Sequence, residues 1–143
     1  MAMAGQPAPL RMAVKRTGVL IFAKDLERLA SFYGSVLGLT PRTTPDGGFV
    51  ELLCDGQVAL SLHALPPAIA SQVALGDPPH AREDTAIKPC FEVDGLEAVR
   101  EVVLAHGARA KDVWEWRGRA YCDCIDPEGN VFQLTSELEP RQT

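Results

Sequence analysis

The chain has 143 residues, of which 46% are hydrophobic and 23% charged, and its 14 Lys+Arg against 19 Asp+Glu give a net charge of −5. This composition indicates one globular domain that can bury an ordinary core, and it argues against collagenous, disordered and disulfide-scaffold proteins. The acidic balance, without any run of Lys or Arg, argues against nucleic acid and anionic membranes as partners.

No apolar stretch approaches the roughly 20 residues of a membrane span, and the N-terminus lacks the charged and apolar regions of a signal peptide. We therefore expect a cytoplasmic protein. Its four cysteines, Cys54, Cys90, Cys122 and Cys124, form neither a disulfide framework nor a C-x-x-C pair, so we expect reduced thiols.

The first half of the chain predicts a strand, a helix and three further strands. Strand formers at 19–23 lead into Asp25, which can cap a helix over 26–37, and Gly38 can end that helix. The further strands are expected at 39–43, 48–54 and 57–64.

The same order of elements recurs in the second half. A strand over 86–93 leads into Asp94, which can cap a second helix, and Gly107 closes the helical pattern. Asp94 lies 69 residues after Asp25, and Gly107 lies 69 residues after Gly38. The further strands are expected at 109–115, 118–125 and 130–136. The chain is therefore expected to repeat one β-α-β-β-β unit.

This repeat predicts how the chain is organised. The expected segments are a flexible leader (1–14), a first βαβββ module (15–64), a linker or flap with two Pro-Pro pairs (65–85), a second module (86–137) and a tail (138–143). Helices on one face of each sheet would leave the other face free. Two such half-sheets can curl into an open cup, where a small ligand would bind.

Two segments carry a resemblance to a known superfamily. The opening VLIFAKDLERLASFYGSVLGL (19–39) and the closing IDPEGNVFQL (125–134) resemble the glyoxalase / bleomycin-resistance / ring-cleaving dioxygenase superfamily, called vicinal oxygen chelate. The resemblance covers about residues 15–137. It implies an α+β fold in which two βαβββ modules form a curved, cup-shaped mixed sheet with helices on the outer face, and it implies a homodimer.

Enzymes of this superfamily usually hold a divalent metal through His, Glu or Gln from the first and last strands of each module. The matching positions here are Gly18, Ser61, Lys88 and Gln133. Glycine has no side chain, a protonated lysine repels a cation, and serine and glutamine are weak ligands at best. We therefore predict no bound cofactor and no metal site of the usual kind. A shifted site with His63 and Gln133, holding Ni, Mn, Fe or Zn, is the alternative.

Strand alternation predicts which side chains line the cup. It places Lys88, Cys90 and Glu92 on one face of their strand, away from the apolar residues that should meet the helices. Pairing Ile125 with Val131 would put Asp123 opposite Gln133, and it would turn Cys122 and Cys124 to the core. The full candidate ligand-binding set is Ser61, His63, Lys88, Cys90, Glu92, Trp114, Trp116, Tyr121, Asp123 and Gln133.

Several of these residues have a second interpretation. Lys88 and Glu92 could simply pair with each other. Cys90 beside Lys88 would have a lowered pKa and some nucleophilic character. Trp114 and Trp116 could stack on a planar ligand, or they could lie in a core or a subunit interface.

Three functions remain open from the sequence. The first is a homodimer that binds a small organic molecule without a metal, as a sequestering resistance or binding protein, and its acidic charge favours a neutral or cationic guest. The second is a lyase, isomerase or dioxygenase of the same fold with a divalent metal on an unusual ligand set. The third is a structural or regulatory dimerisation module whose cup is filled by its own side chains.

Overall fold

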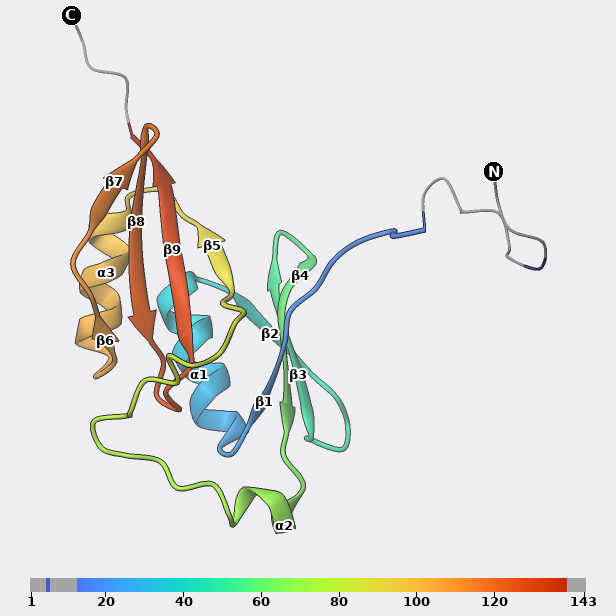
Figure 1. Cartoon of the computed structure of the whole chain (residues 1–143). Coiled ribbons are helices and arrows are strands. Elements are labelled where there is room, and N and C mark those ends of the chain that lie inside the picture. Colours follow the sequence, from blue (N-terminus) through green and yellow to red (C-terminus); the bar gives the residue numbers. More distant parts are fainter. Residues whose placement is uncertain (1–4, 6–12, 139–143) are drawn as a thin grey trace, which may run out of the picture.

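The computed structural model describes residue 5 and residues 13–138, so the expected leader and tail lie almost entirely outside the described residues. The first five major elements are β1 (Leu20–Ala23), α1 (Leu26–Leu37), β2 (Thr40–Thr43), β3 (Phe49–Cys54) and β4 (Gln57–Ala64). Their strands form sheet A in the order β1-β4-β3-β2, with β1 parallel to β4 and the other neighbours antiparallel (Figure 1).

The second half forms sheet B. Its elements are β5 (Cys90–Glu92), α3 (Leu96–Ala105), β6 (Arg109–Ala110), β7 (Trp114–Trp116), β8 (Arg119–Ile125) and β9 (Val131–Glu137). The strand order is β5-β9-β8-β6, and β7 also pairs with β8. The strand expected over 109–115 is therefore interrupted into β6 and β7. The α+β class and the repeated βαβββ order are confirmed.

The segment between the sheets is mostly irregular, as the Pro-Pro pairs predicted. It contains one short helix, α2 (Pro67–Ala70), and then crosses below the two sheets to β5 (Figure 1). Among the described residues, no helix has the length and apolar character needed to cross a membrane.

The caps of the two helices differ. The Asp25 side chain accepts a hydrogen bond from the Arg28 backbone N–H at 3.1 Å, and Gly38 ends α1 with a φ of 66°. The predicted cap at Asp94 is wrong: Gly95, with a φ of 74°, occupies the N-cap of α3 and no side chain caps that end. Because the glycine adopts the left-handed conformation there, the helix begins one residue later and Asp94 lies outside it.

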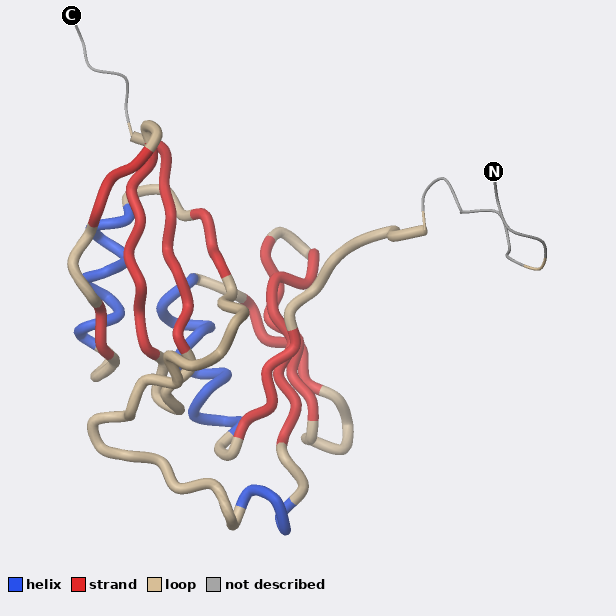
Figure 2. Tube along the Cα trace, in the orientation of Figure 1, coloured by secondary structure: helices blue, strands red, loops and turns tan. Residues whose placement is uncertain are grey.

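A single core joins the two modules. Phe32 and Tyr33 of α1 pack edge-to-face on Phe132 of β9, with ring centroids 6.1 Å and 5.3 Å apart. Leu60 and Leu62 of β4 belong to the same buried cluster. Helix α1 therefore lies between the sheets. Each sheet has one face toward the helices and one outer face that no helix of the described residues covers (Figure 2). Cys122 and Cys124 point into this core, as predicted.

The turn between β8 and β9 fastens the second module to the first. The Glu128 carboxylate accepts hydrogen bonds from the backbone N–H groups of Lys24 and Asp25, both at 2.8 Å. Asp126 accepts one from the Tyr33 hydroxyl at 2.6 Å. At Gly129 an added Cβ would lie 2.1 Å from the His80 carbonyl oxygen, so only glycine fits this turn.

Candidate functional site

The outer face of sheet B carries a hydrogen-bonded network around Asp123. Lys88 Nζ lies 2.9 Å from Asp123 Oδ2, and Gln133 Nε2 donates to Asp123 Oδ1 at 3.1 Å. The Cys90 thiol donates to Gln133 Oε1 at 3.5 Å. The strand register explains this convergence, because Gln133 lies directly between Asp123 on β8 and Cys90 on β5. The predicted pairing of Asp123 opposite Gln133 is confirmed.

A second ionic group lies along the same face. Arg119 of β8 contacts Glu92 Oε1 at 3.0 Å and Glu137 Oε1 at 3.6 Å, and it also donates to the Thr135 hydroxyl. The suggested Lys88–Glu92 pair is therefore wrong. Four residues of extended chain span about 13 Å, whereas each charge has an opposite charge on β8, at 2.9 Å for Lys88 and 3.0 Å for Glu92.

Cys90 does not have the lowered pKa that its lysine neighbour suggested. Partial burial raises the pKa of the Cys90 thiol, and the opposing effects of Arg119 and Lys88 are smaller. The thiol is exposed and hydrogen-bonded to Gln133, but it stays protonated at neutral pH. Its chemistry in this network is that of a weak hydrogen-bond donor.

The two tryptophans have different surroundings. Trp114 stacks on Tyr121 with ring centroids 4.4 Å apart and an interplanar angle of 18°, and it is 46% exposed. Trp116 is 54% exposed near the tip of the β7–β8 hairpin, where the Arg117 guanidinium lies 4.3 Å above its ring. Neither tryptophan lies in the core.

Ser61 and His63 lie on the outer face of sheet A instead. The His63 ring lies between Phe22 and Phe49, with centroids 5.5 Å and 5.9 Å away, and its Nδ1 lies 2.8 Å from the carbonyl oxygen of Ala64. Ser61 is opposite Glu51 in the sheet. Because both sheets turn their inner faces to one core, these two residues and the Asp123 network lie on different sides of a single chain.

These donors do not fit the divalent metal that the resemblance implies. Asp123 is neutralised by the Lys88 ammonium, and the amide of Gln133 is already bonded to Asp123 and Cys90. Gly18 offers no side chain. Within residues 13–138, no three His, Cys, Asp or Glu side chains gather into a group that could hold an ion.

The network opens onto a cleft of about 180 Å³. Its lining residues are Arg82, Glu83, Thr85, Lys88, Lys111, Asp123 and Val131. Lys111 Nζ pairs with Glu83 at 2.6 Å, just as Lys88 pairs with Asp123. Arg82 and Arg119 are absent from the predicted set. Alternation could have identified Arg119, which shares its face with Tyr121 and Asp123, but no periodic signal marks Arg82 in the linker.

Comparison with known proteins places these features in a family. A family model of the Glyoxalase-like domain matches residues 18–135. No curated protein sequence matches the chain. Among solved structures, a glyoxalase/dioxygenase from Nostoc punctiforme is 16% identical with a TM-score of 0.72, covering 94% of this chain and 99% of that chain.

Other solved structures have the same fold. The fosfomycin resistance protein FosX from Listeria monocytogenes is 14% identical with a TM-score of 0.64, covering 90% of this chain and 97% of its own. A glyoxalase/bleomycin resistance protein/dioxygenase family enzyme from Burkholderia phytofirmans is 23% identical with a TM-score of 0.63, covering 84% and 96%. The resemblance to the vicinal oxygen chelate superfamily is thus confirmed, and the chain belongs to the Glyoxalase-like domain family.

Proposed function

We propose that this protein binds a small organic ligand on the outer face of sheet B and does so without a divalent metal ion. The observation that carries the proposal is the 2.9 Å contact between Lys88 Nζ and Asp123 Oδ2. The ammonium neutralises the carboxylate that would otherwise attract a metal. It also keeps free N–H donors for the oxygen atoms of a ligand.

The surroundings of Lys88 support a ligand site. Gln133 and Asp123 offer polar groups, while the stacked pair of Trp114 and Tyr121 adds a flat apolar surface. Small-molecule sites commonly combine a few convergent polar groups with aromatic contact area. A variant of FosX from Listeria monocytogenes was crystallised with Mn(II) and 1S,2S-dihydroxypropylphosphonic acid. In this chain, Lys88 would supply the fixed positive charge beside such a small polar molecule.

We further propose a cytoplasmic homodimer. The outer face of sheet A exposes an aromatic group around His63, and Phe22 in it is 53% exposed. A second copy would cover this group and could bring Ser61 and His63 opposite the Asp123 network of the first copy. The four cysteines are free, which suits a reducing compartment.

The first prediction tests ligand binding directly. A thermal-shift screen of small organic molecules in a chelating buffer should yield ligands that stabilise the untagged protein, because the site needs no metal. A ligand at 100 times its Kd should add about 2.7 kcal/mol of stability. Lys88→Met should remove the shift. Lys15→Met, at an exposed position distant in sequence from Lys88, should keep it. A screen whose every hit requires an added divalent ion would contradict the proposal.

The second prediction concerns the metal itself. Calorimetric titration of the natural chain with Ni²⁺, Mn²⁺, Fe²⁺ and Zn²⁺ should show no stoichiometric binding with a Kd below about 1 µM. Lys88→His should bind Zn²⁺ or Ni²⁺ measurably, because a neutral imidazole would replace the ammonium beside Asp123 and Gln133. Lys15→His is the control and should not gain affinity.

The titration also decides between the two functions. Stoichiometric binding by the natural chain that disappears in His63→Ala would favour a metal-dependent lyase, isomerase or dioxygenase with His63 and Gln133 among its ligands. Equal affinity in the natural chain and in Lys88→His would show that the lysine does not exclude the ion.

A further inference from the structure

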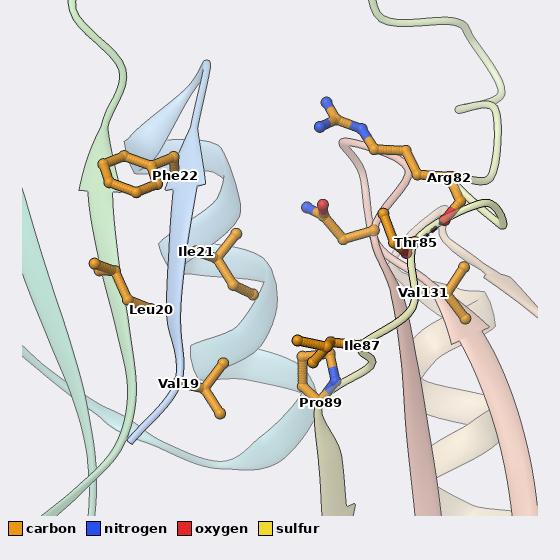
Figure 3. A pocket seen from close by; sticks show the side chains of 10 residues that line it. Val19, Leu20, Ile21, Phe22, Arg82, Thr85, Ile87, Pro89 and Val131 are labelled. Carbon is orange, nitrogen blue, oxygen red and sulfur yellow. Dashed lines mark hydrogen bonds between the residues drawn. The ribbon is translucent and has the colours of Figure 1, made fainter. Parts of the chain in front are cut away.

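A second cleft, of about 300 Å³, lies between the edge of sheet A and the segment that leads into β5 (Figure 3). It adjoins the cleft at the Asp123 network, with which it shares Arg82, Thr85 and Val131. Its lining residues are Val19, Leu20, Ile21, Phe22, Arg82, Thr85, Ile87, Pro89, Asn130 and Val131. This volume is at the lower end of the range for small-molecule sites. None of the residues discussed as the candidate set lines it.

The walls of this cleft are apolar. Figure 3 shows Ile21 of β1 and Val19, which directly precedes this strand, turned toward Ile87 and Pro89, whereas Leu20 and Phe22 turn to the other side. Ile87 is 85% exposed, although its place among the apolar residues of the strand expected over 86–93 predicts that it faces the helices. Covering such an exposed apolar side chain with another apolar group removes apolar surface from water and thereby stabilises the complex.

Of the described residues that line the cleft, one, Arg82, is charged. Arg82 extends from the linker across its mouth toward β1 (Figure 3). The linker backbone is held at this point, because Arg82 N–H donates to the Gly129 carbonyl oxygen at 2.8 Å and the Thr85 hydroxyl donates to the Arg82 carbonyl oxygen at 2.9 Å. The backbone of Arg82 is therefore held against the β8–β9 turn, and its side chain extends from a fixed position.

The charge of Arg82 is not balanced within the cleft. Within the described part of the chain, no acidic residue lines it. Among the described residues, Arg82 makes no ion pair, in contrast to Lys88 and Lys111 in the neighbouring cleft. A guanidinium presents parallel N–H donors that match the two oxygens of a carboxylate.

We propose that this cleft binds a small monoanion with an apolar body, a carboxylate whose oxygens meet Arg82 and whose chain or ring lies between Ile21 and Ile87. The charge of the cleft selects an anion over a cation, and its apolar walls select an aliphatic or aromatic body over a sugar or a phosphate. This site adjoins the one proposed on the outer face of sheet B but does not include Lys88 or Asp123, so neither proposal depends on the other.

The four isoleucines of the chain allow a direct test by methyl NMR. Titration of the ¹³C-methyl-labelled protein with sodium octanoate should shift the signals of Ile21 and Ile87 in a saturable manner. Ile69, which is exposed on α2, should stay unchanged. Octylammonium and 1-octanol should bind more weakly than octanoate, since neither has a carboxylate to pair with the Arg82 guanidinium.

Two variants test the arginine. Arg82→Leu should weaken octanoate binding about fivefold, the size expected for an ion pair open to solvent, and Arg82→Lys should lie between it and the natural chain. Arg28→Leu, at an exposed position on α1, is the matched control and should bind as the natural chain does.

Three results would overturn the proposal. One is the absence of saturable shifts at Ile21 and Ile87 with octanoate. Another is equal affinity for octanoate, octanol and octylammonium, which would show that the cleft does not select an anionic ligand. The third is concentration-dependent shifts of Ile21 and Ile87 without any ligand, together with sedimentation of a larger species, which would assign the cleft to a second copy of the chain.

Discussion

Glu128→Ala should lower the free energy of unfolding by about 3 kcal/mol. The Glu128 side chain is nearly fully buried, and its two oxygens accept the backbone N–H groups of Lys24 and Asp25 just before α1. Truncation leaves both donors without a partner, and each unsatisfied buried donor costs about 1–3 kcal/mol. Urea unfolding, followed by far-UV circular dichroism and by tryptophan fluorescence, measures the loss.

Two further variants make this result specific. Glu128→Gln keeps one acceptor oxygen, so it should lose about half as much stability. Glu27→Ala removes an exposed acid from the first turn of the same helix, where its charge interacts favourably with the helix dipole, and should cost about 0.5 kcal/mol. Equal losses in Glu128→Ala and Glu27→Ala would mean that the contact between turn and helix does not hold the modules together.

The parts of the fold that depend on local patterns could be predicted from the sequence. Alternating apolar residues and the glycine turns placed the strands within one or two residues of their observed bounds, apart from the broken strand at β6 and β7 and the short β5. The register of β8 on β9 was predictable because a tight turn joins them, and a tight turn leaves little freedom in the pairing.

The parts that depend on long-range packing could not. Asp94 and Asp25 have equivalent positions in the repeat, yet only Asp25 caps its helix, because Gly95 takes the cap position in the second module. The position of α1 between the sheets follows from aromatic contacts such as Tyr33 on Phe132, which join residues about 100 positions apart. Periodicity contains no information about such contacts.

The candidate site shows the same division. Alternation correctly put Lys88, Asp123 and Gln133 on one face of sheet B. It did not reveal that Lys88 pairs with Asp123, since this depends on how β5 aligns with β9 after a long linker. It also grouped His63 with these residues, although one chain holds them on different sheets. His63 and the Asp123 network can meet only between two copies of the chain, and the alternation of residues along a strand contains no information about such an assembly.

Tyr33→Phe should lower the free energy of unfolding by about 2 kcal/mol at neutral pH. The Tyr33 hydroxyl donates to Asp126 Oδ2 at 2.6 Å, and both side chains are buried. Burial and the nearby Asp126 raise the pKa of Tyr33, so the hydroxyl remains a donor well into alkaline pH. A hydrogen bond to a charged group contributes about 1.5–3 kcal/mol, which sets the expected loss.

The pH dependence of this loss identifies its cause. Burial raises the pKa of Asp126, and hydrogen bonds from Tyr33 and Asn130 oppose this rise only in part. The folded chain therefore keeps the proton that the unfolded chain releases near pH 3.9, and stability falls as the pH rises from about 4 to the folded pKa. Tyr33→Phe removes a donor that favours the carboxylate, so the pKa of Asp126 should rise further.

The difference in stability between Tyr33→Phe and the natural chain should consequently grow as the pH rises from 4 to 7, because the variant's Asp126, with the higher pKa, gives up its proton less readily. Other carboxyl groups titrate alike in both proteins, so they cancel in this difference. Tyr121→Phe is the matched control, because the Tyr121 ring stacks on Trp114 and its hydroxyl makes no hydrogen bond to the described residues. A loss in Tyr33→Phe that is constant between pH 4 and pH 7 would assign the effect to packing and not to the buried carboxylate.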